Sequence, residues 1–314
     1  MTVRRFDFLD IPTLARYRRD VLTLDSARAL TRGNPIGAAA LLSYLNPRRF
    51  IFTAVASEDG KHLIGQITLT ETETAARLNF LAPQDGPEGL IVPLVETLVA
   101  EAGGWGAFHI LAEVEESSRV FHSLKQAGFS MYAWQRVWKL VPADDGTADK
   151  VWRPARGVDW PAVQSLHSQI VPAPLQPVET LPGQVEGLVC REGDDLLAYV
   201  AVEAGPAGVW LKPLIPPDSD CIPRLAGVLN GIGGRRRPVY VCVRSYQAWL
   251  ESVLKDLGAE PGPQQAVMVK RLALMTRAEQ AVKSMEKVLA KPAAPVARTV
   301  PGDELQTKSD ITNV

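Results

Sequence analysis

Two glutamates at the carboxyl end of an apolar segment are the side chains best suited to act as a general base. Residues 108–114 form this segment, and Glu113 and Glu115 stand directly before an amphipathic stretch. A carboxylate in that position could take a proton from an ammonium group, directly or through water. Charges at the end of a strand are also commonly just solvated, so both interpretations stay open, with Glu113 as the catalytic candidate.

Other residues with chemical potential have a structural explanation. Glu71 and Glu73 lie among threonines, as in an exposed hairpin, and His109 and His122 have no second ligand at metal-binding spacing. The three cysteines, Cys190, Cys221 and Cys242, form no CxxC pair. The sequence therefore predicts no metal site and no disulfide framework, which fits a reducing compartment.

Charge and hydrophobicity exclude several classes of partner. The chain has 314 residues, 34 basic against 35 acidic side chains and a net charge of -1. No overall field attracts it to nucleic acid or to an anionic membrane, and the run Arg235–Arg237 lies in a short connection where charge is usually solvated. The N-terminus does not resemble a signal peptide, and no run approaches ~20 apolar residues. We expect a cytoplasmic protein with no nucleic-acid or membrane partner.

The elements that position these residues occur twice. Val3–Phe6 and Val151–Pro154 are matching strand openings, and each is followed by a predicted helix, a hairpin, a third strand and a second helix ending in glycine. The hairpins are 50–69 and 187–202, the third strands 76–82 and 209–215, and the helices 90–102 and 222–229. Two copies of one unit are the simplest explanation.

The closing part of each unit repeats with a constant offset. Strands 108–114 and 239–243 lead into helices 118–127 and 246–257, and Leu124 and Gly128 match Leu254 and Gly258 at an offset of 130. Strands 131–140 and 266–272 then complete the units. We predict an α/β fold with a mixed sheet, a first domain at 1–141, a linker at 142–150, a second domain at 151–274, and a helical then disordered tail at 275–314.

This order of elements resembles the GNAT superfamily of N-acetyltransferases. The most similar local stretch is Leu81-Ala82-Pro83, followed by Gly86-Pro87-Glu88-Gly89-Leu90-Ile91 at the start of a helix. In that family the loop aims backbone N–H groups and the positive helix end at the pyrophosphate of coenzyme A. The resemblance implies acetyl-CoA or another acyl-CoA as cofactor, bound by Leu81, Ala82, Gly86, Pro87, Glu88, Gly89, Leu90, Ile91 and, at the family's asparagine position, Ser117.

The sequence also departs from the family pattern. Only the central Gly89 remains of the loop's characteristic residues, Pro87 removes a donor, and Glu88 adds a negative charge. The second copy has 219–224 in the same place, without glycine, and Gln247 at the asparagine position. Leu124 and Leu254 occupy the positions of the tyrosine that can protonate a thiolate, which leucine cannot do.

Three functions are compatible with these residues. The first is acyl transfer from coenzyme A to a small-molecule or peptide amine, because orientation of the reactants alone accelerates such a step. The second is a non-catalytic scaffold or ligand-binding module that kept the fold. The third is a related tandem transferase that moves another acyl or aminoacyl group. The residues do not indicate the oligomeric state.

Overall fold

Each half of the chain begins with the same ion-paired corner. Arg4 holds the carboxylate of Asp10 with two hydrogen bonds of 2.7 and 2.6 Å, and Arg153 holds Asp159 with two of 2.8 Å. In each corner, the carboxylate also accepts a main-chain N–H three residues earlier, at 2.9 and 2.8 Å. The repeated strand opening predicted from the sequence is confirmed, down to its hydrogen bonds.

The computed structural model describes residues 1–36, 49–140, 152–181, 187–217, 221–232 and 237–272. Residues 1–140 are called the first half and residues 152–272 the second half. The strands of the first half are β1 (Thr2–Arg5), β2 (Leu22–Thr23), β3 (Arg49–Glu58), β4 (Lys61–Thr70), β5 (Ala75–Ala82), β6 (His109–Glu115) and β7 (Ser130–Leu140). Its helices are α1 (Ile11–Arg16), α2 (Ser26–Arg32), α4 (Glu88–Gly104) and α5 (Arg119–Gln126).

The second half repeats this order. Its strands are β8 (Trp152–Pro154), β9 (Gly187–Glu192), β10 (Asp195–Ala204), β11 (Val209–Leu214), β12 (Val239–Arg244) and β13 (Glu260–Arg271). Its helices are α6 (Trp160–Ile170), α7 (Cys221–Ile232) and α8 (Trp249–Asp256), with short 3-10 turns at Ala173–Leu175 and Ser245–Gln247. The hairpins, third strands and closing helices predicted from the sequence are therefore present in both halves.

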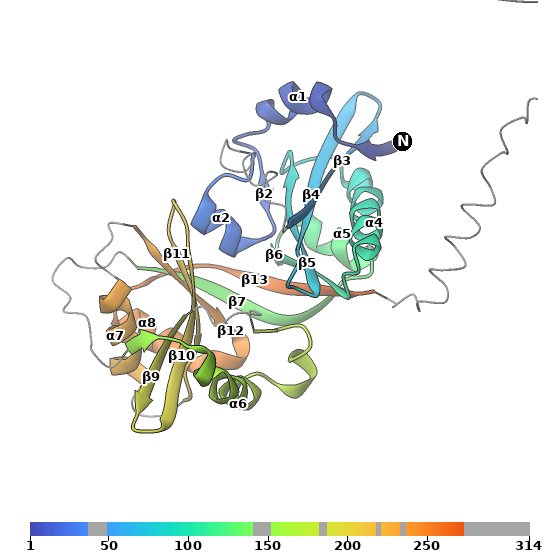
Figure 1. Cartoon of the computed structure of the whole chain (residues 1–314). Coiled ribbons are helices and arrows are strands. Elements are labelled where there is room, and N and C mark those ends of the chain that lie inside the picture. The colour runs from blue at the N-terminus through green and yellow to red at the C-terminus, as the bar shows by residue number, and fades with distance from the viewer. Residues whose placement is uncertain (37–48, 141–151, 182–186, 218–220, 233–236, 273–314) are drawn as a thin grey trace, which may run out of the picture. The chain divides into compact units, whose positions relative to one another are not determined.

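The last strands of the two halves are exchanged. The sheet runs in the order β1-β3-β4-β5-β6-β13-β7-β12-β11-β10-β9-β8, so β13 lies between β6 and β7, and β7 pairs with β12. The two long strands run side by side between the halves (Figure 1). The expectation that each last strand completes its own unit is wrong, because each one pairs with the preceding strand of the other half.

An internal two-fold relation is centred on β7 and β13. Gln135 and Gln265 are direct partners in this antiparallel pair, and they are separated by the 130 residues that also relate α5 to α8. Gln135 Nε2 donates to Gln265 Oε1 over 2.8 Å. A residue that pairs with its own repeat equivalent must lie on the two-fold axis, so this pair marks the axis of the duplication.

Each half has its own core on one face of the sheet. In the first half α4 and α5 cover that face with side chains such as Leu90, Leu94 and Leu124, and in the second α7 and α8 do so with Leu225 and Leu250. Gly128 and Gly258 end the last helices with φ of +84° and +77°, a conformation that favours glycine. These caps match the prediction.

Three predicted boundaries shift. Helix α4 continues through Gly103 and Gly104 because the N–H of Trp105 still bonds to Glu101 O, and the left-handed residue is Gly106. Helix α7 likewise continues past Gly231 to Ile232. Strand β13 starts at Glu260, earlier than expected, with a register shift between Pro261 and Gln264 where the prolines lack an N–H.

Several predictions fall outside the described residues. These are the linker at 142–150, residues 218–220 of the second loop, and the tail from residue 275 onward. Residues Met1–Leu272 form one compact unit. The proposed domain limits therefore stay predictions. Among the described helices, none is long and apolar enough to cross a membrane.

Candidate functional site

The predicted cofactor loop joins the buried end of β5 to the start of α4. Leu81, Ala82, Leu90 and Ile91 are all buried in hydrophobic clusters, so only their main-chain groups are available to a ligand. Gly86 is required for close packing, because a Cβ there would lie 2.5 Å from Leu63 Cδ1. The loop is thus tightly held between strand and helix.

The mouth of this loop is acidic. Pro87 precedes α4 without a side-chain cap, and Glu88 and Gly89 are exposed, with open space where a Cβ of residue 89 would be. Asp85 lies beside them and pairs with Arg119 at 3.0 Å. Ser117 is exposed in the turn before α5. Two carboxylates near the helix start oppose the attraction of its dipole for a phosphate.

The space between β5 and β6 beyond this loop is filled by the chain itself. The two parallel strands pair only from Ala75 to Arg77, and then separate. Strand β2 pairs with the end of β5, with Leu22 opposite Leu81. Leu24 continues the bridge, since its N–H donates to Asn79 O and its carbonyl accepts from Glu113 N, both at 2.9 Å.

Coenzyme A bound along β5 would meet an occupied strand edge. Its thiol ends an extended arm of amide groups, and an arm running from the α4 N-terminus along β5 requires a free strand edge. Leu22–Leu24 already use that edge, and Leu24 is only 1% exposed. Glu88 and Gly89 are exposed at the mouth of the loop, but the strand edge beyond them is occupied.

Glu113 has a structural task. Its side chain is buried, and Oε2 accepts the main-chain N–H of Ser26 over 2.9 Å at the start of α2. It is therefore not a solvated strand-end charge, and its role as a base stays a prediction. Glu115, two residues on, is the exposed carboxylate. The sequence did not reveal that residues 24–26 would reach this strand.

The second half closes the corresponding gap with side chains. Strands β11 and β12 pair in parallel from Val209 to Leu211 and then separate. Gln247 Nε2 donates to Pro213 O over 2.9 Å, and Trp249 Nε1 donates to Ile215 O over 3.1 Å. Gln247 is 1% exposed. The carbonyls that face the gap are therefore satisfied within the chain.

A cavity of about 580 Å³ lies between the two halves and is lined by many charged and hydroxyl side chains. The first half contributes threonines and arginines of β3, β4 and β5, together with residues of α2. The second half contributes Trp210, Lys212 and Leu214 of β11, Arg244 of β12 and the segment 178–181. Among the predicted residues, Glu73 and Glu113 line this cavity, and those of the cofactor loop do not.

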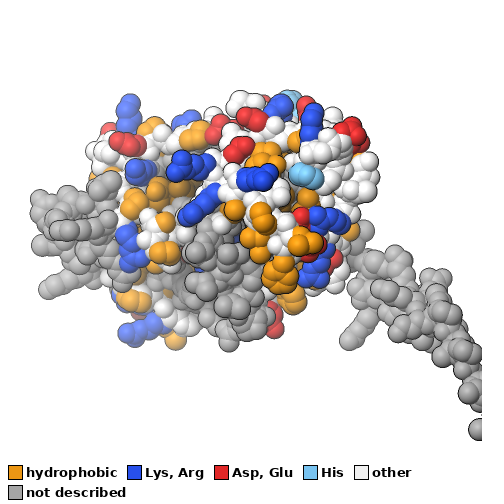
Figure 2. Space-filling model, turned by 90° about the horizontal axis from the view of Figure 1, so that it is seen from above, with side chains coloured by type: hydrophobic (Ala, Val, Ile, Leu, Met, Phe, Trp, Pro, Cys, Tyr) orange, Lys and Arg blue, Asp and Glu red, His pale blue; other side chains and the backbone are white. Residues whose placement is uncertain are grey.

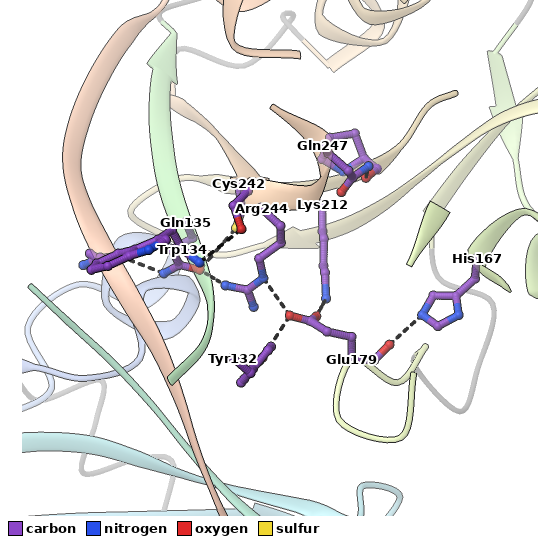
Figure 3. A network of polar contacts seen from close by, with 12 residues as sticks. Tyr132, Trp134, Gln135, His167, Glu179, Lys212, Cys242, Arg244 and Gln247 are labelled. Carbon is purple, nitrogen blue, oxygen red and sulfur yellow. Dashed lines mark hydrogen bonds and ion pairs between the residues drawn. The ribbon is translucent and has the colours of Figure 1, made fainter. Parts of the chain in front are cut away.

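A buried carboxylate hub forms the second-half wall (Figure 3). Glu179 is 3% exposed and pairs with Lys212 and with Arg244, whose Nε lies 2.8 Å from Oε1. The hydroxyl of Tyr132 donates to the same oxygen over 2.9 Å. Burial alone would raise the pKa of Glu179, but Arg244 and Lys212 hold it well below its usual range. The carboxylate therefore stays charged.

Burial also shifts the pKa values of three neighbours of this hub, upward for Cys242 and Tyr132 and downward for His167. Burial raises the pKa of the Cys242 thiol to about 11, and it also raises the pKa of Tyr132. Neither group ionises near neutral pH, so neither is an activated nucleophile or base. His167 bonds through Nε2 to Glu179 O at 2.6 Å, and burial lowers the pKa of its ring. The hub is thus built for charge and hydrogen bonding.

Sequence reasoning missed this hub. Lys212 and Arg244 stand at alternating positions of apolar strands, where inward-pointing charges predict a buried partner. These two cations were visible in the sequence, but their partners could not be identified from it. Glu179 comes from a Pro-rich loop with no periodic pattern, and Tyr132 comes from the exchanged strand of the other half.

The face of the molecule shown in Figure 2 offers no concentration of one charge among its described residues. In the face shown in Figure 2, basic and acidic side chains are interspersed over the described residues. Among all the described residues, no group of three metal-binding side chains is assembled, and Cys190 and Cys242 are buried. The central cavity is therefore the strongest candidate site.

No protein-family pattern matches the chain, and no curated protein is similar to it in sequence. Solved structures are similar in fold. A GCN5-related N-acetyltransferase from Sphaerobacter thermophilus is 14% identical, with 87% of this chain and 96% of that chain covered at a TM-score of 0.53. A tandem GNAT protein from the clavulanic acid biosynthesis pathway is also 14% identical, with 87% and 99% covered at a TM-score of 0.49. Given the duplicated order of elements, the chain has a mixed α/β fold of two tandem GNAT-like units, the fold of the GCN5-related N-acetyltransferases.

Proposed function

We propose that this protein binds a small molecule in the cavity between its halves and uses the GNAT fold as a scaffold, without coenzyme A chemistry. The observation that carries the proposal is the bridge of Leu22–Leu24, which bonds to both β5 and β6 where a thioester arm would need space. A chain that fills this gap with its own backbone has given up the edge by which it would hold such an arm.

The cavity has the properties of a ligand site. Its volume of about 580 Å³ falls within the range of about 300–1,000 Å³ typical of small-molecule pockets. Charged and hydroxyl side chains line the first-half wall, and the second-half wall combines the charged hub around Glu179 with aromatic and aliphatic side chains. Its position at the interface of two units is also where such pockets commonly occur.

Titration calorimetry and thermal shift on the full chain test this proposal. A ligand that binds the native state raises the melting temperature with concentration. Stabilising compounds should lose their effect in Ala201→Trp, which places a large ring on the cavity wall, and should keep it in Gly89→Trp at the predicted cofactor loop. Binding of acetyl-CoA at micromolar concentration with turnover of an amine, lost in Gly89→Trp, would refute the proposal.

Acyl transfer from coenzyme A to an amine is the second candidate function. One observation favours it: the start of α4 is open to solvent at Gly89, as the resemblance implies for a pyrophosphate site. On this hypothesis residues 81–82, residues 86–91 and Ser117 contact the cofactor, and residues 22–24 must leave the gap. Acetyl-CoA should then increase hydrogen exchange at Leu24 and Glu113, whereas unchanged protection would count against it.

A further inference from the structure

The first-half wall of the cavity presents arginines that lack partners. Arg49 of β3 and Arg77 of β5 both line it, and both are half-buried. Among the described residues, neither guanidinium has a hydrogen bond or an ion pair. A partly desolvated guanidinium with free N–H groups is unfavourable unless something accepts those hydrogen bonds.

The sheet register directs the two arginines to the same place. Arg49 lies opposite Thr70, and Arg77 lies opposite Thr68, on the two sides of β4. Directly paired residues share a face of an antiparallel sheet, and so do residues two apart on one strand. The two guanidinium groups therefore extend over one patch of threonines, and all four side chains line the cavity.

The charges around this patch leave room for an anion. Burial lowers the pKa of Arg49, and the nearby Arg32 lowers it further, whereas Asp25, Glu73 and Glu113 outweigh burial and raise the pKa of Arg77. The carboxylates that face this wall are Asp25, Glu73, Glu113 and Glu203. Among the described residues, none lies within ion-pair distance of Arg49 or Arg77.

Two of those carboxylates are already engaged by main-chain groups. Asp25 accepts the N–H of Arg28 at 3.2 Å, and Glu113 accepts the N–H of Ser26 at 2.9 Å. Burial raises the pKa of Asp25, and Glu203 is exposed at 3.8 Å from Arg32. They moderate the positive wall without occupying its hydrogen-bond donors.

The facing wall indicates the rest of the ligand. Trp210, Leu214 and Val178 line the cavity from the second half, beside Lys212, Glu179 and Arg244, whose charges are paired with one another. Arginine forks bind carboxylate or phosphate oxygens in pairs of parallel hydrogen bonds. We infer that Arg49 and Arg77 form an oxyanion subsite, which holds the carboxylate or phosphate of an organic ligand while its apolar part contacts Trp210 and Leu214. This inference rests on the proposed function and adds the ligand's chemical class.

Four matched probes test the inference on the full chain at low ionic strength. Phenylacetate and phenyl phosphate carry the anion, and phenylacetamide and phenethylamine are neutral and cationic analogues of the same size. We expect calorimetry to show binding of at least one anion, at least tenfold tighter than either analogue and weakened by salt. The stronger anion identifies the carboxylate or phosphate class. Absence of anion binding at millimolar concentration overturns the inference.

Variants assign the binding to these residues. Arg49→Gln and Arg77→Gln should each weaken the anion at least tenfold, whereas Arg16→Gln, an equal loss of charge at an exposed position of α1, should leave it unchanged. Arg49→Lys should give an intermediate loss, because it keeps the charge and loses the fork. If Arg77→Gln fails to fold, the comparison of Arg49→Gln with Arg49→Lys decides.

The outcomes separate the inference from the proposed function. If the neutral or cationic probe binds best and Ala201→Trp abolishes that binding, the cavity is a ligand site and the oxyanion subsite is wrong. Anion binding that survives both glutamine variants and is lost in Ala201→Trp would likewise show that the cavity binds a ligand and that Arg49 and Arg77 do not form the subsite. Acetyl-CoA turnover lost in Gly89→Trp instead removes the proposed function itself.

Discussion

The two halves share one chain path but close the gap between their diverging parallel strands by different means. In the first half the main chain of residues 22–24 enters the gap and bonds to both strands. In the second half the side chains of Gln247 and Trp249 reach the carbonyls of Pro213 and Ile215. The same fold thus tolerates two separate solutions to one requirement, which is that buried main-chain groups find hydrogen-bond partners.

The halves also differ in how they place negative charge at the centre. In the first half the carboxylate of Glu113 belongs to strand β6, and Ser26 at the start of α2 supplies a main-chain donor. In the second half strand β12 supplies a cation, Arg244, and the loop after α6 supplies the carboxylate of Glu179. One half satisfies its buried charge with the backbone, and the other uses a network of charged side chains.

The largest expected effect breaks the charge network of the second half. Glu179→Gln removes the anion that Arg244 and Lys212 share, and leaves two cations together at a buried position. Loss of one partner from a buried ion pair typically costs about 3–5 kcal/mol of unfolding free energy. Urea denaturation of the full chain measures it.

Glu113→Gln is the matched control for this variant. The amide oxygen of glutamine can still accept the N–H of Ser26, so the expected loss is only about 1–2 kcal/mol. Equal losses for the two variants would show that the halves do not differ in the way described here.

A smaller effect compares the two gap fillings. Leu24→Ala removes a side chain that is 1% exposed, and should destabilise the protein by about 2–4 kcal/mol. Gln247→Leu leaves the carbonyl of Pro213 without its donor, at a cost of about 1–3 kcal/mol. Thermal unfolding measures both, and a larger loss for Gln247→Leu would contradict the expected order, in which the packing of Leu24 contributes more than the hydrogen bond of Gln247.

The smallest effect concerns the ion-paired corners and appears at acid pH. Hydrogen bonds from Arg153 hold the pKa of Asp159 at about 2, and Arg4 lowers the pKa of Asp10. Asp159 has a second partner, because Arg191 Nε lies 3.0 Å from Oδ1. We expect Asp159→Asn to lower the melting temperature at pH 6 by about 4 °C, and Asp10→Asn by less.

The sign of the pH dependence follows from the lowered pKa values. A carboxylate with a folded pKa below its unfolded value stabilises fully above about pH 4, and this stabilisation disappears as the pH falls toward 2. Melting temperatures between pH 2 and 6 should therefore converge for the wild type and Asp159→Asn at the acid end. A constant difference over the whole range would exclude ionisation of Asp159 as the cause.

The sequence by itself determined the elements and their duplication. Apolar periodicity located the hairpins, the third strands and the closing helices, and the offset that matches Leu124 with Leu254 also relates Gln135 to Gln265 at the two-fold axis. These features depend on local periodicity and on glycine at left-handed positions, and both are visible in a single segment. The glycine at 128 ended its helix as predicted, whereas those at 103 and 104 did not.

The tertiary structure alone decided which strand completes which half and what fills the space between strands. The exchange of β7 and β13 leaves each strand's own pattern unchanged, since either partner offers the same hydrogen-bonding edge. The bridge at Leu24 and the hub at Glu179 join residues far apart in the chain through main-chain and side-chain bonds. Such contacts depend on loop paths, and loop residues carry no periodic signal from which those paths can be read.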